Sequence, residues 1–350
     1  MTAPAAPWRR ARDFLTGQPL YWREASLCAP AIPLILLAGV ALHQIGYAAV
    51  ATGAAFSVGF GAARDLRGRR WGAMIAASAG TTLAAFVGCL AGQWPWALIG
   101  LAGLAAVACA MLALEDEDLW WVALQMVVAL LVAGHFAGPL HAAVLRSAAV
   151  LAGGVLQLLV VMVMARLIPS AAQRLPPGPP KPPSPRSLYI GHAARAAGCV
   201  CFTLWLAGRL GLANGYWAPM TAMLVLKPGL SDTHVRGLAR LGGTLIGCIV
   251  ATLFALAVGY GWPWLIAGVA LASTAAFALQ KAHYAVLTSC ITATVVLLLA
   301  LAGAGAALVT AEHRLIATLI GGLVALIAAR IAPHRPLAAA PGPDRVGEAA

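Results

Sequence analysis

The stretch from Gly215 to Gly247 holds the residues whose chemistry is easiest to interpret. Tyr216 and Trp217 come first, and a proline-interrupted apolar run then ends in Lys227. An ammonium group at the inner end of a short membrane helix would attract a carboxylate, and the two rings could stack on an aromatic substrate. Broken helices in lipid occur where protein or a water-filled cavity satisfies the freed backbone groups. We therefore expect this stretch to line a permeation path.

A basic helix entry follows the lysine. Arg236 and Arg240 lie one helical turn apart, and the small residues Gly243, Thr244 and Gly247 come next. Positive charge at the cytosolic mouth of a path concentrates anions, whereas small residues let membrane helices approach closely. We therefore expect the arginines to recruit an anion and the small residues to pack against a neighbouring helix.

Each of these features also has a purely structural interpretation. Lys227 would then extend to the cytosolic headgroups, and the two arginines would be ordinary positive-inside anchors. Tyr216 and Trp217 would belong to the aromatic belt at the membrane interface. The residues alone leave both interpretations open.

A second charged cluster opens the last apolar segment, where Glu312, His313 and Arg314 are consecutive. An interfacial ion pair between Glu312 and Arg314 is the simpler interpretation, and a proton relay through the pair is the functional one. Thr318 and Gly321 follow in the same segment, and we expect them to permit close helix packing.

These residues belong to a chain too apolar for a soluble enzyme. Of its 350 residues 61% are hydrophobic and 10% are charged, whereas soluble domains have about 25% charged residues. The seven cysteines lie in apolar runs and are expected to be small core residues. The basic residues are spread over short loops, which disfavours a nucleic-acid surface. Phosphate-loop, zinc-protease and nucleophile-elbow motifs are missing from the sequence, so we expect neither an enzyme nor a cofactor or metal.

Apolar runs of about 20 residues predict ten to twelve membrane-spanning helices. The second and eighth runs are short, and prolines in the eighth indicate a broken, tilted or re-entrant helix. The predicted spans are 28–46, 48–63, 71–91, 94–114, 119–137, 143–167, 190–212, 215–230, 238–260, 262–280, 284–303 and 313–332.

The two halves of the chain repeat each other at an offset of 168 residues. Trp94-Pro95-Trp96 corresponds to Trp262-Pro263-Trp264, and Arg146 corresponds to Arg314. Such scarce residues seldom recur in the same order by chance. We therefore expect an all-α fold, a polytopic transmembrane helical bundle of two parallel six-helix repeats.

The distribution of basic residues predicts that both termini and the central linker face the cytosol. Residues 1–25 have no uninterrupted apolar run and no small-residue cleavage site, so we expect no removable signal peptide there. The expected domains are a cytosolic amphipathic segment (1–27), the first six-helix repeat (28–169), a Pro-rich cytosolic linker (170–189), the second repeat (190–333) and a disordered cytosolic tail (334–350).

In this second half the sequence resembles the fusaric acid resistance (FUSC) type of bacterial inner-membrane proteins, which are related to aromatic acid exporters. In larger exporters of this type a sizeable cytosolic domain follows a six-helix block, whereas here a short linker joins the halves. The residues that carry the resemblance are Tyr216-Trp217, the run Leu224–Pro228, the pattern Arg236-x-x-x-Arg240-x-x-Gly243-Thr244-x-x-Gly247, and Arg314 with Thr318–Gly321.

The resemblance implies a multi-pass transporter of the bacterial inner (plasma) membrane that exports aromatic or other organic weak acids. The proton-motive force is a candidate energy source. Its expected partners are the lipid bilayer and a small organic anion, and no nucleic acid. A homo-oligomer and a periplasmic efflux partner are compatible with this type, although no residue specifies either. The alternatives are a non-transporting membrane scaffold or assembly protein and a channel-like pore.

Overall fold

The structure, a computed structural model, describes residues 20–172, 185–227, 230–303 and 307–331. Within these ranges the regular structure is helical, apart from one isolated bridge between Leu66 and Arg69. The prediction of an all-α fold is confirmed for this part of the chain. Parts of the predicted linker (173–184) and the predicted tail (334–350) lie outside the described residues.

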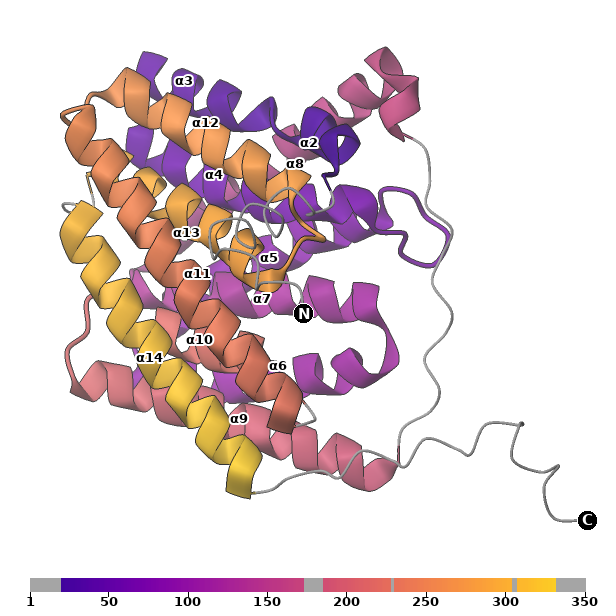
Figure 1. Cartoon of the computed structure of the whole chain (residues 1–350), viewed down its shortest axis with the longest axis vertical. Helices are drawn as coiled ribbons and strands as arrows, with labels where there is room; N and C mark the ends of the chain where they lie inside the picture. Colours follow the sequence, from indigo (N-terminus) through magenta and orange to yellow (C-terminus); the bar gives the residue numbers. More distant parts are fainter. Residues whose placement is uncertain (1–19, 173–184, 228–229, 304–306, 332–350) are drawn as a thin grey trace, which may run out of the picture.

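Long helices arranged side by side build the molecule (Figure 1). The first half contains α2 (Trp22–Cys28), α3 (Ala31–Ala41), α4 (Ile45–Gly59), α5 (Gly72–Ala91), α6 (Pro95–Glu115), α7 (Glu117–His135) and α8 (Leu140–Leu167). The second half contains α9 (Arg186–Arg209), α10 (Trp217–Val225), α11 (Leu230–Ala257), α12 (Trp262–Ala278), α13 (Tyr284–Leu301) and α14 (Ala307–Ile331).

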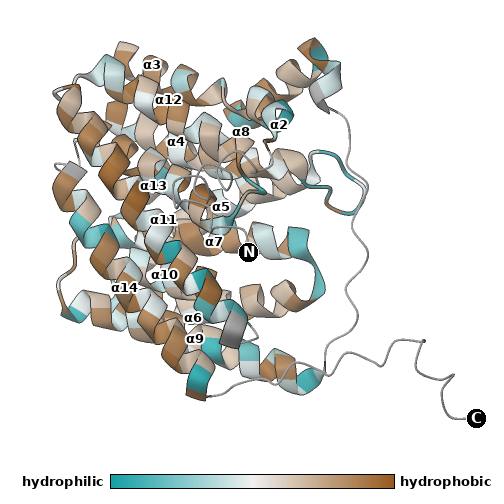
Figure 2. Ribbon diagram, viewed as in Figure 1, coloured by the Kyte–Doolittle hydropathy of each residue, from teal (hydrophilic) through white to brown (hydrophobic). Residues whose placement is uncertain are grey.

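In the described residues, ten segments are long and apolar enough to cross a membrane, with α2 and α3 counted as one. Helix α12, with 17 residues, is slightly shorter, and α10 has nine. Hydrophobic residues run along the lengths of the helices (Figure 2), and large side chains such as Leu253, Leu323 and Ile327 are more than half exposed. Lipid is the solvent that such a surface requires. The prediction of a polytopic membrane protein is therefore confirmed.

The hydropathy of the sequence predicted that the first span begins at residue 28. In the structure it begins at Trp22. Arg23 and Glu24 lower the hydropathy of this turn, but its other face, which includes Ala25 and Leu27, is buried in a helix packed on α12. Helix α9 likewise begins at Arg186, inside the segment 170–189 that was predicted to be a linker.

Prolines interrupt the first span between α2 and α3, and Gln157 of α8 bridges the break. The N–H of Ile32 bonds to the Ala29 carbonyl instead of the Cys28 carbonyl. Gln157, which is fully buried, donates its Nε2 hydrogen to the Cys28 carbonyl at 3.0 Å. The side chain thus satisfies a backbone acceptor that Pro30 and Pro33 displace from the regular helix pattern.

Helices at corresponding positions in the two halves pack against corresponding partners. In the first half α4 packs on α8, α5 on α7 and α8, and α6 on α7. In the second half α10 packs on α14, α11 on α13 and α14, and α12 on α13. The halves are also interleaved, because α6 lies along α9 while α12 lies along α2 and α3 (Figure 1).

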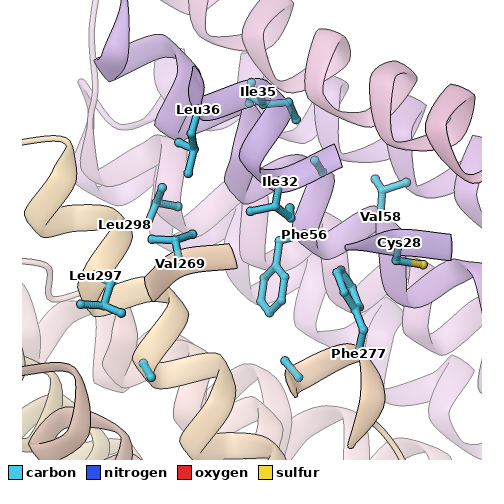
Figure 3. Close-up of a cluster of buried hydrophobic side chains, with 14 of the residues drawn as sticks. Cys28, Ile32, Ile35, Leu36, Phe56, Val58, Val269, Phe277, Leu297 and Leu298 are labelled. Atoms are coloured by element: carbon cyan, nitrogen blue, oxygen red, sulfur yellow. The ribbon is translucent and has the colours of Figure 1, made fainter. Parts of the chain in front are cut away.

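A buried hydrophobic cluster joins the halves (Figure 3). Phe277 of α12 lies between two rings of the first half, with its centroid 5.3 Å from Phe56 and 5.0 Å from Phe60. Ile32 of α3 and Val269 of α12 are fully buried in the same cluster. The two halves therefore share one core and do not form two separate domains.

Candidate anion-binding site

Helix α10 is short because of the residues at its end. Lys227 precedes Pro228, and a residue before proline is disfavoured in the helical conformation. Leu226 is already extended, with φ −62° and ψ 122°. The Thr233 hydroxyl accepts from the Lys227 N–H at 3.0 Å and lies 3.2 Å from its carbonyl. The eighth predicted span is thus a short helix that is not among the ten spanning segments.

Arg314 of α14 lies on the indole ring of Trp217, the first residue of α10. Its guanidinium carbon is 4.7 Å from the ring centroid, and the exposed fractions of the two residues are 4% and 3%. The interpretation of Trp217 as an interfacial belt residue is therefore wrong, and the same holds for Tyr216, which is 5% exposed.

The ion pair predicted between Glu312 and Arg314 is not formed. Glu312 is exposed, whereas within the described residues no carboxylate lies within 4.0 Å of Arg314. Residues two apart on a helix point to nearly opposite sides, so the two side chains cannot meet while Arg314 faces α10.

Arg240 of α11 is the second buried arginine of the site, with an exposed fraction of 5%. Its Nη1 donates to the Tyr284 hydroxyl of α13 at 3.5 Å. It lies close enough to Arg314 for the two positive charges to repel each other. The Nε atoms of Arg240 and Arg314 are both buried and have no hydrogen-bond partner. Two cations thus share a buried region in which the described residues supply no negative charge.

Arg236, one turn before Arg240, has a different role. Its Nε donates to the Leu224 carbonyl at 2.9 Å, near the C-terminal end of α10. That end carries carbonyls without helical partners and a partial negative charge, which a guanidinium neutralises. The guanidinium carbon also lies 4.0 Å from the centroid of the Tyr284 ring. Tyr284 therefore contacts both arginines of α11.

Three buried threonine hydroxyls lie along the contact between α11 and α13. Thr244, Thr288 and Thr292 are fully buried, and their Oγ1 atoms have no hydrogen-bond partner. Other buried hydroxyls bond to a preceding helix carbonyl, as Thr203 does to Cys199 at 2.6 Å, although those of Thr52 and Thr252 also have no partner among the described residues. Unsatisfied buried hydroxyls are uncommon in proteins, so these three offer donors to a polar ligand.

The small residues of the motif bring these helices together. A Cβ on Gly243 would meet the Ala285 carbonyl of α13, and one on Gly247 would meet the Ser289 carbonyl. On α14, a Cβ on Gly321 would meet the Ala218 carbonyl of α10. Their lack of a side chain thus sets the close approach of the helices around the arginines.

The remaining residue of this part of the site is Thr318, which is 4% exposed and lies one turn after Arg314. It shares a face of α14 with Arg314 and Gly321. It therefore belongs to the contact of α14 with the rest of the site.

Lys227 lies apart from the two buried arginines. Its ammonium nitrogen is 5.1 Å from the ring centroid of Trp120, which belongs to α7 in the first half of the chain. A cavity of about 60 Å³ lies beside it, lined by Cys109, Trp120, His192 and Lys227 together with smaller apolar residues. The predicted path residues therefore fall into two groups at opposite ends of α10.

A third set of contacts extends from Tyr216 into the first half. Its ring centroid lies 5.2 Å from His135 and 6.4 Å from Phe136. The Arg146 guanidinium carbon lies 5.0 Å from the centroid of Phe136, and the buried Nε of Arg146 has no hydrogen-bond partner. Trp217 in turn lies 5.3 Å from Tyr216, measured between ring centroids. A series of aromatic rings therefore connects Trp217 to Arg146, which corresponds to Arg314 in the repeat of the two halves.

Sequence reasoning missed Tyr284 and Trp120, the aromatic partners of the cationic residues. Tyr284 opens an apolar span, where a tyrosine with a polar neighbour, His283, was the available signal. Trp120 follows an acidic loop, and no pattern in the sequence connects it with Lys227, 107 positions later.

The fold and the buried cations define a multi-pass helical membrane protein with a polar site inside the bundle. Residues 199–328 match a family described as fusaric acid resistance protein-like. This part of the chain is therefore similar to that family, as the resemblance of its motifs predicted. The matched region includes Trp217, Arg240, Tyr284 and Arg314, and so contains the whole arginine site. No curated protein and no solved structure matches the chain.

Proposed function

We propose that this protein transports organic anions, and aromatic carboxylates in particular, out of the cytosol across the bacterial inner membrane. The observation that carries the proposal is the pair Arg240 and Arg314, two buried cations with no acidic partner in the described part of the chain. A buried charge without compensation is strongly destabilising, and charged residues inside membrane proteins commonly line substrate paths. An anionic substrate would supply the missing negative charge.

The aromatic rings support an aromatic substrate. Trp217 lies against Arg314, and Tyr284 lies against Arg240, so a carboxylate held by the guanidinium groups would carry its ring beside an aromatic wall. Guanidinium binds carboxylate with strong, charge-assisted hydrogen bonds. The hydroxyl of Thr244 is a further donor on the same helix as Arg240.

The family resemblance supports the proton-motive force as the energy source. In this scheme the arginines stay charged throughout the cycle, because guanidinium does not deprotonate under physiological conditions. The proton gradient would then act through the acid that is carried or through a group elsewhere in the chain. Transport measured with and without an imposed gradient separates gradient-driven export from passive flux.

The membrane orientation belongs to the same proposal, with both termini and the linker in the cytosol. Two parallel six-helix repeats would place the linker on the side of the termini, and the matching neighbours of α4–α8 and α10–α14 support such repeats. A fluorescent protein that folds only in the cytosol, inserted at residue 178 or fused to the C-terminus, should fluoresce in both cases. A linker found outside the cytosol would make the halves inverted.

Inside-out membrane vesicles test transport directly. Radiolabelled aromatic acids, with benzoate as the first probe, should accumulate in vesicles that contain the wild-type protein and an imposed proton gradient. Arg314→Gln and Arg240→Gln should each reduce the initial rate at least about tenfold, the effect of losing one charge-assisted hydrogen bond. Arg209→Gln is the matched control, because Arg209 also lies on a tryptophan ring, 5.8 Å from Trp205, but is exposed.

The outcomes separate the alternatives. Flux that follows the anion gradient in either direction and ignores the proton gradient would indicate a channel-like pore. Folded protein that moves none of the acids would favour a scaffold or assembly role. Equal rates for Arg314→Gln and the wild type would contradict the assignment of this site.

A further inference from the structure

The cavity beside Lys227 lies between the two halves of the chain, away from the arginine pair. Helices α6 and α7 of the first half supply Cys109 and Trp120, while α9 and α10 of the second half supply His192 and Lys227. Residues of both halves are therefore needed to form the cavity. Its other lining residues are alanine, leucine and methionine.

The polar groups of the cavity favour an anion. Lys227 brings a positive charge, and His192, which is 4% exposed, brings an imidazole. None of the described residues that line the cavity is acidic. A positive charge with low-dielectric walls focuses its field on the opening and raises the local concentration of anions.

The cavity lies near one end of each of the four helices. Cys109 and Lys227 lie near the C-terminal ends of α6 and α10, while Trp120 and His192 lie near the beginnings of α7 and α9. In the proposed orientation these are the cytosolic ends. The cavity therefore faces the compartment from which an exported acid would come.

The size of the cavity limits what can enter. Its volume of about 60 Å³ compares with about 150 Å³ for an engineered protein cavity that binds benzene. A carboxylate group and its neighbouring carbon fit this volume, and an aromatic ring does not. The ring of a larger acid would remain at the opening.

We propose that this cavity is a cytosolic entry site that binds the carboxylate group of the transported acid before the acid reaches Arg240 and Arg314. Lys227 pairs with the carboxylate, and Trp120, whose ring centroid lies 5.1 Å from the ammonium nitrogen, forms the wall beside it. The inference rests on the proposed function, but the site is separate from the arginine pair. Lys227 follows the C-terminal end of α10, whereas Trp217 opens the helix at its other end.

Fluorine NMR of the full-length protein labelled with 5-fluorotryptophan provides a test that does not depend on transport. The Trp120 resonance is assigned as the one missing from Trp120→Phe. Sodium acetate, which fits the cavity, and sodium benzoate, whose ring does not, are titrated at constant ionic strength against sodium chloride. Both carboxylates should shift the Trp120 resonance saturably. The resonance of Trp96, which is 74% exposed, is the internal control and should not follow the same curve.

Two variants of Lys227 identify the charge as the cause. Lys227→Gln should weaken acetate binding about tenfold or more, because a charge-assisted bond to the carboxylate is lost. Lys227→Arg keeps the charge and should retain the shift. An unmoved Trp120 resonance, an equal response to chloride or to acetamide, or equal affinities in Lys227→Gln and the wild type would each overturn the site.

The Arg314→Gln variant separates this inference from the proposed function. It should lose transport while the Trp120 resonance still responds to acetate. If the wild type moved no acid but Trp120 responded, the entry site would stand as a carboxylate site and the transport proposal would fail. If transport occurred and Trp120 never responded, the transport proposal would stand and the entry site would fail.

Discussion

The guanidinium of Arg314 lies 4.7 Å from the ring centroid of Trp217, and both side chains are buried. A cation on an indole ring gains about 2 kcal/mol when desolvated. Removing an ion from water costs several kcal/mol in real proteins. The ring alone therefore leaves much of this cost uncompensated, and a second buried arginine, Arg240, adds repulsion. The site is organised for a negative charge that the described chain does not provide.

Replacing Arg314 by methionine should therefore stabilise the protein while abolishing transport. Methionine fills a similar volume without a charge, and such replacements of buried ions have stabilised proteins by about 1–4 kcal/mol. Thermal unfolding of the purified protein in detergent measures the first effect, and vesicle uptake measures the second. Arg209→Met, at an exposed position, should change stability by less than about 0.5 kcal/mol. A large loss of stability in Arg314→Met would instead make Arg314 a structural residue.

Two adjacent glycines of α11 should respond oppositely to alanine. The added Cβ at position 243 would meet the Ala285 carbonyl and lie 2.8 Å from the Thr288 Cβ, whereas one on Gly242 would meet nothing within 4 Å. Gly243→Ala should therefore cost about 1–3 kcal/mol through overpacking. Gly242→Ala should be neutral or gain about 0.5–1 kcal/mol from helix propensity. Melting temperatures of the two variants check the pair, and equal values would show that α11 and α13 are not in close contact.

Thr288→Val tests the function of the hydroxyls between α11 and α13. The Thr288 hydroxyl has no partner, so its replacement by an apolar group of the same shape should not destabilise the fold. Uptake should nevertheless require more substrate for half-maximal rate, because a donor to the anion is lost. Thr203→Val is the converse control. Its hydroxyl donates to the Cys199 carbonyl, so it should cost about 0.5–1.5 kcal/mol and leave uptake unchanged. Unaltered uptake in Thr288→Val would remove this hydroxyl from the path.

Gln157→Leu should destabilise the protein by about 1–3 kcal/mol, because the Cys28 carbonyl would lose its bond and remain buried. The free energy of unfolding in a denaturing detergent titration measures the effect. Gln93, which is exposed and donates to the Leu90 carbonyl near the end of α5, gives the control substitution Gln93→Leu. If the two variants unfolded alike, the bridge between α2 and α8 would contribute little.

Much of the fold follows from the sequence because lipid imposes a simple rule. Apolar runs of about 20 residues must become helices, so most helices were placed to within a few residues. The first span was misjudged at Trp22–Cys28, where one face is charged and the other is buried against α12, which is distant in the sequence. Hydropathy averages over the faces of a helix and cannot detect such a turn.

The sequence predicted most residues of the candidate site, but it did not predict which of them lie together. Arg236 and Arg240 look alike in the sequence, yet the first caps α10 through the Leu224 carbonyl and the second is buried beside Tyr284. The two side chains differ in their contacts because Arg240 lies one helical turn further along α11 than Arg236. The contact between Lys227 and Trp120 joins the two halves, and no local pattern specifies contacts at that separation.

The interleaving of the halves has a consequence for biogenesis. The backbone N–H of Tyr21 bonds to the Ala278 carbonyl at 2.7 Å, and α2 and α3 pack on α12. Roughly 250 residues must therefore be synthesised after the first span before its partner exists, which takes about 12–50 s at ribosomal rates of about 5–20 residues per second. During this interval the first span resides in the bilayer with its future contact face covered by lipid or by the insertion machinery. The arrival of α12 then joins the first span to the second half, and α13 and α14 follow to complete the bundle.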